Sequence, residues 1–373
     1  MKHLLIIGGG VAACESAVSA RKMRPDWKIT MVSDEPILPY RRPALSKMVA
    51  DDLIDPVKLL IHPESFYRDL QIDVRLNTCV SRIDAEEKCA LTVADEKISY
   101  DELIIATGAG AWRPPVPGTD LPGVMSFRNY ADLLKLRELL SGGLKNVVIV
   151  GAGLLGLELS ESLLKRGCQV KMVDNQQQLL SRNLDAGGSE FFRRQLGKVE
   201  NLSFHLGQSL QEILPGKAVL SDGTVLDNEL VIFSAGTRPV FPVLSGAAPG
   251  VRLEVDLQMR TAFDHIFAAG DVAASPVPNP GLYLPARDMG QVAGTVAGGG
   301  DARFKMQESP VRFAAFGIKV FSCGQFSAAV RSTDLSSEGK YCREFYSADD
   351  RLLAVVLIGD VSAASSYLEK LKP

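Results

Sequence analysis

Two short stretches, residues 4–13 (LLIIGGGVAA) and residues 147–156 (VVIVGAGLLG), decide the fold of this chain. Each starts with four apolar residues, typical of a buried strand, and continues through a glycine-rich turn into a helical pattern. The pattern predicts strand 4–7, helix 11–22 and strand 28–32, and then strand 146–150, helix 154–166 and strand 169–173. The second set repeats the first about 143 residues downstream. The sequence therefore predicts an α/β fold with two Rossmann-like units.

The glycines of both turns have the spacing that dinucleotide binding requires. The first set is Gly8, Gly10 and Ala13 (G-x-G-x-x-A), and the second is Gly151, Gly153 and Gly156 (G-x-G-x-x-G). The first glycine allows a tight turn, the second lets the backbone approach a pyrophosphate, and the small third residue lets the helix pack on the strand. The helix N-terminus adds N–H donors and partial positive charge. We expect one dinucleotide at each turn.

An acidic residue is expected at the end of the second strand of each unit, where it holds a ribose hydroxyl. In the first unit Asp34 and Glu35 are both candidates, with a slight preference for Asp34. In the second unit the acid is Asp174. Residues 175–178 (NQQQ) contain no arginine that could neutralise a 2′-phosphate, which favours NADH over NADPH.

Composition excludes several other classes. The 41 basic and 44 acidic residues give a net charge of −3, so no strong overall field attracts nucleic acid or an anionic membrane. No apolar run reaches the length of about 18 residues typical of a membrane span. The chain begins directly in a strand, and its six cysteines form no Cys-x-x-Cys pair, so we expect reduced thiols in the cytoplasm. The four histidines have no metal-ligand spacing, and no metal site is expected.

Prolines 114, 115, 117 and 122 mark a connector, and short alternating runs begin near Pro310. We therefore expect three domains. A first domain covers 1–110 and 240–305, a second covers 111–239 and is inserted in the first, and a small α+β domain covers 310–373.

Further motifs resemble a known family. These are residues 38–47 (LPYRRPALSK), 106–108 (ATG), 236–239 (GTRP) and 269–272 (AGDV). Together with the two turns they resemble the pyridine nucleotide–disulfide oxidoreductase superfamily. The nearest resemblance is to its branch without a redox disulfide, which holds rubredoxin reductases, oxygenase-coupled ferredoxin reductases and the flavoprotein portion of NADH-dependent nitrite reductase. No cysteine lies between Cys14 and Cys79, where disulfide reductases carry their redox pair.

The resemblance implies FAD at the first domain and NADH at the second. It also implies roles for individual residues. Lys47 and Glu158 are expected to pair beside the flavin N5 as the catalytic residues. Tyr283 stands where oxygenase-coupled relatives have a tryptophan that screens the flavin edge. The other FAD or nucleotide contacts implied are Arg42, Val80, Ala106, Thr107, Gly108, Asp271 and Gly236.

The function implied is hydride transfer from NADH to FAD, followed by electron transfer to a small redox protein such as rubredoxin. An NADH oxidase and the electron-input flavoprotein of a nitrite-reductase-like system stay open as alternatives. A redox-responsive flavoprotein and a thiol or persulfide reductase are further rivals, the latter without a good cysteine candidate. A monomer and a homodimer are equally compatible with the sequence.

Overall fold

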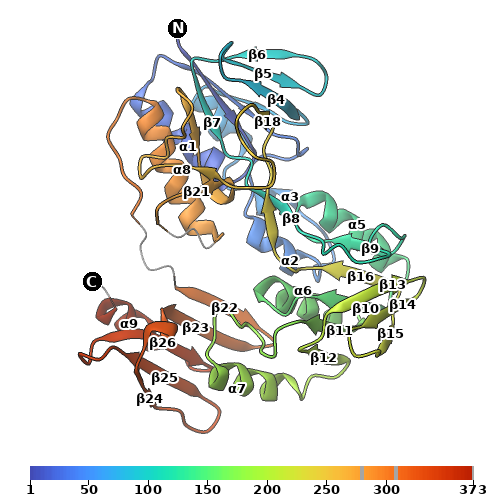
Figure 1. The fold of residues 1–373 in the computed structure, drawn as a ribbon. Helices are drawn as coiled ribbons and strands as arrows, with labels where there is room; N and C mark the ends of the chain where they lie inside the picture. The colour runs from blue at the N-terminus through green and yellow to red at the C-terminus, as the bar shows by residue number, and fades with distance from the viewer. Residues whose placement is uncertain (278–280, 306–309, 372–373) are drawn as a thin grey trace. The chain divides into compact units, whose positions relative to one another are not determined.

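The structure, a computed structural model, describes residues 1–277, 281–305 and 310–371 (Figure 1). The chain divides into two units, each assembled from separate segments. Unit 1 is made of Met1–Leu45, Leu53–Gly110 and Thr237–Gln307. Unit 2 is made of Ser46–Asp52, Ala111–Gly236 and Glu308–Pro373. The boundaries of the three predicted domains stay a prediction, and the two units group the chain differently, since the C-terminal segment and residues 46–52 belong with unit 2.

Unit 1 is built on a parallel sheet with the strand order β20-β7-β1-β2-β3. The strands are β1 (His3–Ile7), β2 (Lys28–Val32), β3 (Ile72–Arg75), β7 (Glu102–Ile105) and β20 (Ile266–Ala268). In the central strand Leu4, Leu5 and Ile6 are fully buried, as expected of a parallel strand covered on both faces. The predicted strands 4–7 and 28–32 and the helix between them are confirmed, the helix being α1 (Val11–Met23).

Helix α1 packs closely against α8 (Tyr283–Ala297). A Cβ atom at Gly290 would lie 2.3 Å from the Ala12 carbonyl oxygen, and one at Gly294 would lie 2.1 Å from the Ser16 carbonyl oxygen. Only glycine fits at these two positions, and the absence of a side chain there allows α1 and α8 to pack closely.

The remaining elements of unit 1 are shorter. A second sheet has the order β18-β4-β5-β6, and β19 pairs with β21. Their bounds are β4 (Val80–Asp84), β5 (Cys89–Thr92), β6 (Lys97–Ser99), β18 (Val243–Leu244), β19 (Leu253–Glu254) and β21 (Ala273–Ala274). The helical segments are η1 (Arg42–Ala44), α3 (Pro56–Leu59), α4 (Glu64–Asp69) and η2 (Gly270–Val272). Strands β8 (Ala109–Ala111) and β17 (Thr237–Pro239) form a two-stranded ladder.

Unit 2 repeats the parallel design with the order β12-β11-β10-β16-β9. The strands are β9 (Val124–Ser126), β10 (Asn146–Val150), β11 (Gln169–Asp174), β12 (Leu202–Leu206) and β16 (Leu230–Phe233). The helices are α2 (Leu45–Met48), α5 (Tyr130–Ser141), α6 (Leu154–Lys165) and α7 (Ala186–Leu196). A small antiparallel sheet joins β13 (Leu210–Leu214), β14 (Lys217–Leu220) and β15 (Val225–Asp227). The predicted second βαβ unit is confirmed.

The C-terminal part of unit 2 is an antiparallel sheet with the order β22-β23-β26-β25-β24. Its elements are β22 (Val311–Ala315), β23 (Ile318–Gly324), η3 (Phe326–Ala328), β24 (Arg331–Asp334), β25 (Tyr341–Tyr346), β26 (Leu352–Ile358) and α9 (Ala364–Lys370). Helix α9 covers one face of this sheet through Ala364 and Tyr367. The α+β character predicted for the C-terminal segment is confirmed.

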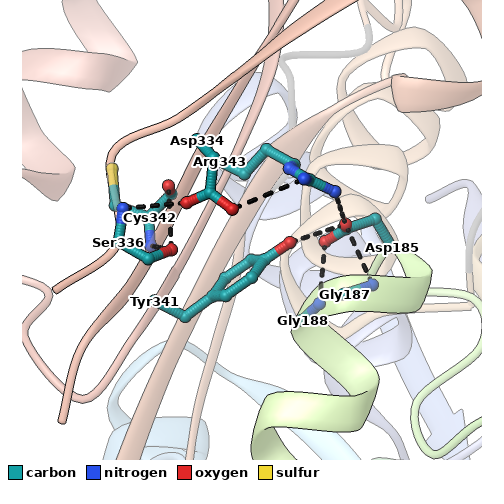
Figure 2. Close-up of polar contacts among 8 residues, drawn as sticks. All are labelled: Asp185, Gly187, Gly188, Asp334, Ser336, Tyr341, Cys342 and Arg343. Atoms are coloured by element: carbon teal, nitrogen blue, oxygen red, sulfur yellow. Dashed lines mark hydrogen bonds and ion pairs between the residues drawn. The ribbon is translucent and has the colours of Figure 1, made fainter. Parts of the chain in front are cut away.

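Asp185 joins this sheet to α7 (Figure 2). Its carboxylate caps α7 by accepting hydrogen bonds from the N–H groups of Gly187 and Gly188. It also accepts one from the Tyr341 hydroxyl at 2.7 Å and lies 3.3 Å from an Arg343 nitrogen. Burial and the bond to Asp185 raise the pKa of Tyr341, so the hydroxyl stays a donor near neutral pH.

Replacing Tyr341 with phenylalanine is expected to lower the free energy of unfolding by about 1.5–3 kcal/mol, the usual contribution of a buried hydrogen bond to a charged group. Urea unfolding followed by circular dichroism measures this loss. Tyr346→Phe is the matched control. The Tyr346 hydroxyl donates its hydrogen bond to Glu344, which lies two residues earlier in the same strand. Equal losses in the two variants would contradict the bridging role of Tyr341.

Among the residues that the structure describes, no helix is long and apolar enough to cross a bilayer.

Candidate functional site

The first glycine turn leaves open space beside a helix N-terminus. Gly8 has φ +135°, and a Cβ atom there would lie 2.2 Å from the Ala106 carbonyl oxygen, so only glycine fits. Gly10 is the N-cap of α1, and no side chain caps the helix. Within the described part of the chain, a Cβ atom at Gly10 would meet nothing within 4 Å. Ala13 is fully buried in the first turn of the helix.

The second turn has the same geometry. Gly151 has φ +118°, and a Cβ atom there would lie 2.4 Å from the Ser234 carbonyl oxygen. Gly153 is the N-cap of α6. Among the residues described, no side chain caps this helix, and a Cβ atom at Gly153 would meet nothing within 4 Å. At Gly156 it would lie 2.1 Å from the Gly151 carbonyl oxygen, so this glycine permits the contact between helix and turn.

Both turns therefore fit a dinucleotide pyrophosphate. Each presents an uncapped helix N-terminus with unfilled space at the second glycine, where an anion would meet N–H groups and the positive end of the helix dipole. Gly8, Gly10 and Ala13 would hold one dinucleotide, and Gly151, Gly153 and Gly156 the other.

The two acids considered after β2 differ in their surroundings. Asp34 is exposed. The Glu35 side chain is 15% exposed, lies 2.7 Å from an Arg42 nitrogen and accepts a hydrogen bond of 2.6 Å from the Tyr40 hydroxyl. The structure thus gives Glu35 a fixed orientation at the end of the strand.

The Arg42 charge interacts with Glu35 in an ion pair and, electrostatically, with Asp271. Burial disfavours the Arg42 charge, but Tyr40, Glu35 and Asp271 together raise its pKa above the ordinary value. Asp271 lies in η2, directly after β20, and a Cβ atom on Gly281 would be 3.8 Å from its carboxylate. Two segments that are distant in sequence, residues 35–42 and Asp271, therefore contribute to one charged cluster.

The other residues predicted in unit 1 lie at strand ends. Ala106, the residue that follows β7 in the chain, is buried. The Thr107 hydroxyl donates a hydrogen bond to the Val240 carbonyl oxygen. Gly108 has φ +71°. Val80 is buried at the start of β4, as a plain core valine would be.

Tyr283 begins α8 and is half-buried near Cys14 and Glu15. Burial raises the pKa of the Tyr283 hydroxyl. Cys14 is fully buried, its thiol lies 3.4 Å from the Tyr67 hydroxyl, and burial raises the pKa of Cys14 to about 11. The thiolate is therefore scarce near neutral pH, which supports a structural role for Cys14. The six cysteines, all within the described residues, form no disulfide.

Asp174, at the end of β11, is bound to the backbone of the second turn. Its carboxylate accepts hydrogen bonds from Ala152 N–H at 2.6 Å and from Gln176 N–H at 2.8 Å. The acid is therefore fixed beside the glycines. Gly236 has φ +111°, and a Cβ atom there would meet no described residue within 4 Å.

Lys47 and Glu158 both lie in unit 2 but are not hydrogen-bonded to one another. Glu158, on the second turn of α6, accepts a hydrogen bond of 2.7 Å from the Ser46 hydroxyl. Lys47 is exposed, and its charge favours the ionised form of Glu158. Sequence reasoning assigned no role to Ser46, Tyr40 or Tyr67. The partners of Ser46 and Tyr67 are distant in sequence, and no local pattern signals them.

Two Rossmann-type sheets, each with a dinucleotide turn, define an oxidoreductase that uses two nucleotide cofactors. The chain belongs to the pyridine nucleotide-disulphide oxidoreductase family, whose model matches residues 2–290. The family confirms the predicted class of enzyme and its FAD and NADH cofactors.

Curated relatives give the same picture. The chain is 30% identical over 368 residues to NADH-rubredoxin oxidoreductase of Clostridium acetobutylicum, covering 96% of this chain and 91% of that protein. It is 29% identical over 377 residues to nitrite reductase [NAD(P)H] of Bacillus subtilis, covering 97% of this chain but only 46% of that protein. This chain therefore spans less than half the length of that relative.

Solved structures also match over almost the whole chain. The ferredoxin reductase for the CYP199A2 system from Rhodopseudomonas palustris has a TM-score of 0.88 and 26% identity, covering 98% of this chain and 93% of that one. The NADH:rubredoxin oxidoreductase from Clostridium acetobutylicum has a TM-score of 0.82 and 27% identity, covering 99% and 94%. The predicted fold class is confirmed.

Proposed function

We propose that the protein is an FAD-dependent NADH oxidoreductase that passes electrons to a small redox protein of the rubredoxin type. The observation that supports this most strongly is the pair of equivalent glycine turns, one in each unit, each with an acid at the end of the neighbouring strand. FAD, when bound, accepts a hydride as an electron pair and releases the electrons singly. The domains at 1–110 with 240–305 and at 111–239 are proposed to hold FAD and NADH respectively.

The residues of unit 1 are proposed to bind and orient FAD. At the first turn, the N-terminus of α1 receives the FAD pyrophosphate, and Glu35, held by Arg42 and Tyr40, is the better oriented acid for a ribose hydroxyl. Asp271, Val80, Thr107 and Tyr283 are proposed to complete the FAD contacts.

At the second turn, Asp174 is proposed to bind the NADH ribose and to repel the 2′-phosphate of NADPH, with Gly236 as a further nucleotide contact. Lys47 and Glu158 are proposed to act beside the flavin, Lys47 by stabilising negative charge there and Glu158 by holding the lysine in place.

The proposed acceptor rests on relatives. Besides the clostridial enzyme, rubredoxin-NAD(+) reductase of Pseudomonas putida is 31% identical over 277 residues. A rival function is NADH oxidase, because a protein of that name from Methanocaldococcus jannaschii is 31% identical over 322 residues. Electron input to a nitrite reductase is the second rival, suggested by the Bacillus relative. The proposed compartment is the cytoplasm, which is consistent with six cysteines outside any disulfide.

Anaerobic stopped-flow mixing tests the proposal. We expect NADH to bleach the flavin much faster than NADPH, and oxidised rubredoxin to restore the colour promptly. Fast reoxidation by oxygen with no response to rubredoxin would assign the protein as an oxidase. A purified protein without flavin would refute the proposal.

A further inference from the structure

Ser46 and Glu158 meet although 112 residues separate them. The Ser46 hydroxyl donates a hydrogen bond of 2.7 Å to a Glu158 carboxylate oxygen. Ser46 is only 1% exposed, and Glu158 is half-buried on α6, two residues after Gly156. A hydrogen bond to a carboxylate in such a site is stronger than one in water.

The segment that carries Ser46 is firmly attached to unit 2. Arg137, on α5, donates hydrogen bonds to the carbonyl oxygens of Val49 at 3.0 Å and Asp52 at 2.7 Å, and also to that of Asp51. Arg166, at the end of α6, forms an ion pair of 3.1 Å with Asp52. These contacts place Ser46 beside Glu158 as part of one unit.

The surroundings of Glu158 shift its pKa in opposite directions. Burial raises the pKa of Glu158, while the Ser46 hydroxyl and the Lys47 charge lower it. Glu161, one turn further along α6, raises it slightly. Among the residues that the structure describes, Lys47 forms no ion pair with Glu158, so the Ser46 hydroxyl is the direct contact that favours the ionised carboxylate.

We propose that Ser46 is a positioning residue whose hydroxyl orients the Glu158 carboxylate and limits its affinity for a proton. This rests on the proposed function, because Glu158 is one of the two residues proposed there to act beside the flavin. It changes the expected arrangement of the site: Ser46 orients the acid, and the Lys47 ammonium remains available for negative charge that develops beside it. Ser46 therefore keeps Glu158 ionised over a wider pH range than burial alone would allow.

Carbon-13 NMR of the flavin-loaded protein, labelled at the glutamate carboxyl carbons, tests this directly. The Glu158 signal is identified by its absence in Glu158→Gln, and its shift is followed with pH. In Ser46→Ala we expect Glu158 to bind its proton roughly tenfold more tightly, so the midpoint moves to higher pH. Ser46→Thr, which keeps the hydroxyl, is expected to restore the wild-type midpoint.

Ser160→Ala is the matched control. Ser160 is fully buried on the same helix and also donates a hydrogen bond of 2.7 Å, but to the Gly156 carbonyl oxygen. We expect this variant to leave the Glu158 titration unchanged. The proposal is overturned if Ser46→Ala titrates like the wild type, or if Ser160→Ala moves the midpoint equally.

If Ser46→Ala fails to fold, Ser46→Cys takes its place, because a thiol has similar size and is a weaker donor. It must move the midpoint upward by a smaller amount, and a wild-type midpoint would refute the proposal. The titration requires neither NADH nor an electron acceptor, so it can succeed where the proposed function fails. If both hold, the pH at which flavin bleaching by NADH changes rate moves in the same direction as the Glu158 midpoint.

Discussion

A methyl group at position 10 is expected to remove FAD from the protein and leave its fold intact. In Gly10→Ala the new Cβ atom meets no atom of the described residues within 4 Å, and the extended backbone of Gly10 suits alanine. The methyl group instead occupies the space proposed for the FAD pyrophosphate. We expect at least about a 100-fold loss of affinity, which corresponds to ~2.7 kcal/mol.

Flavin absorbance per mole of purified protein, and titration of the apoprotein with FAD, measure this loss. Circular dichroism reports the fold. Gly8→Ala is the contrasting variant, because its Cβ atom would collide with the Ala106 carbonyl oxygen at 2.2 Å, and it is expected to destabilise the fold itself. A yellow, fully loaded Gly10→Ala protein would rule out the proposed FAD site.

The corresponding change in unit 2 is expected to impair the reaction with NADH without affecting FAD binding. Gly153→Ala should retain FAD but slow flavin reduction by NADH about 100-fold at low NADH concentration, because the methyl group lies where the NADH pyrophosphate is proposed to bind. Stopped-flow reduction over a range of NADH concentrations measures this. Reduction at the wild-type rate would place NADH elsewhere.

Gly156→Ala provides the comparison for this variant. Its Cβ atom would lie 2.1 Å from the Gly151 carbonyl oxygen, so we expect a loss of stability as well as a loss of NADH reactivity. A thermal unfolding midpoint equal to that of Gly153→Ala would contradict this distinction.

The sequence predicts the two βαβ units well because their signals are local. A run of buried apolar residues, a glycine turn and an apolar helix stripe follow one another within about 30 residues of chain. The strand at Asn146–Val150 has the predicted bounds, and α1 and α6 differ from prediction by one residue.

Helix α8 was not predicted, and the reason is tertiary. Its sequence contains Pro285, Gly290 and Gly294, which argue locally against a helix. The two glycines are there because α1 packs so closely that a Cβ atom would strike its backbone. The helix propensity of one segment carries no information on a neighbour that is distant in sequence. Ser16 and Gly290, which are hydrogen-bonded, are 274 residues apart.

The polar part of the site shows the same limit. The family motif drew attention to Lys47, but the hydrogen bond to Glu158 comes from the residue before it. The spacing after β2 does not decide whether Asp34 or Glu35 is the ribose-binding acid. The structure distinguishes them, because Tyr40 and Arg42 contact Glu35. Residue types could be predicted from the motifs, whereas hydrogen-bond partners depend on the folded path of the loop after β2 and on how distant segments meet.

The division of the chain has a consequence for biosynthesis. The polypeptide passes from one unit to the other after residues 45, 52, 110 and 236, and returns to unit 2 before residue 310. A nascent chain that ends at Gly236 therefore contains neither unit in full. Since domains generally fold as units, an apolar strand such as β7 lacks partners that are synthesised much later, including β20 and α8. We expect the emerging chain to depend on chaperones until its last third has been synthesised.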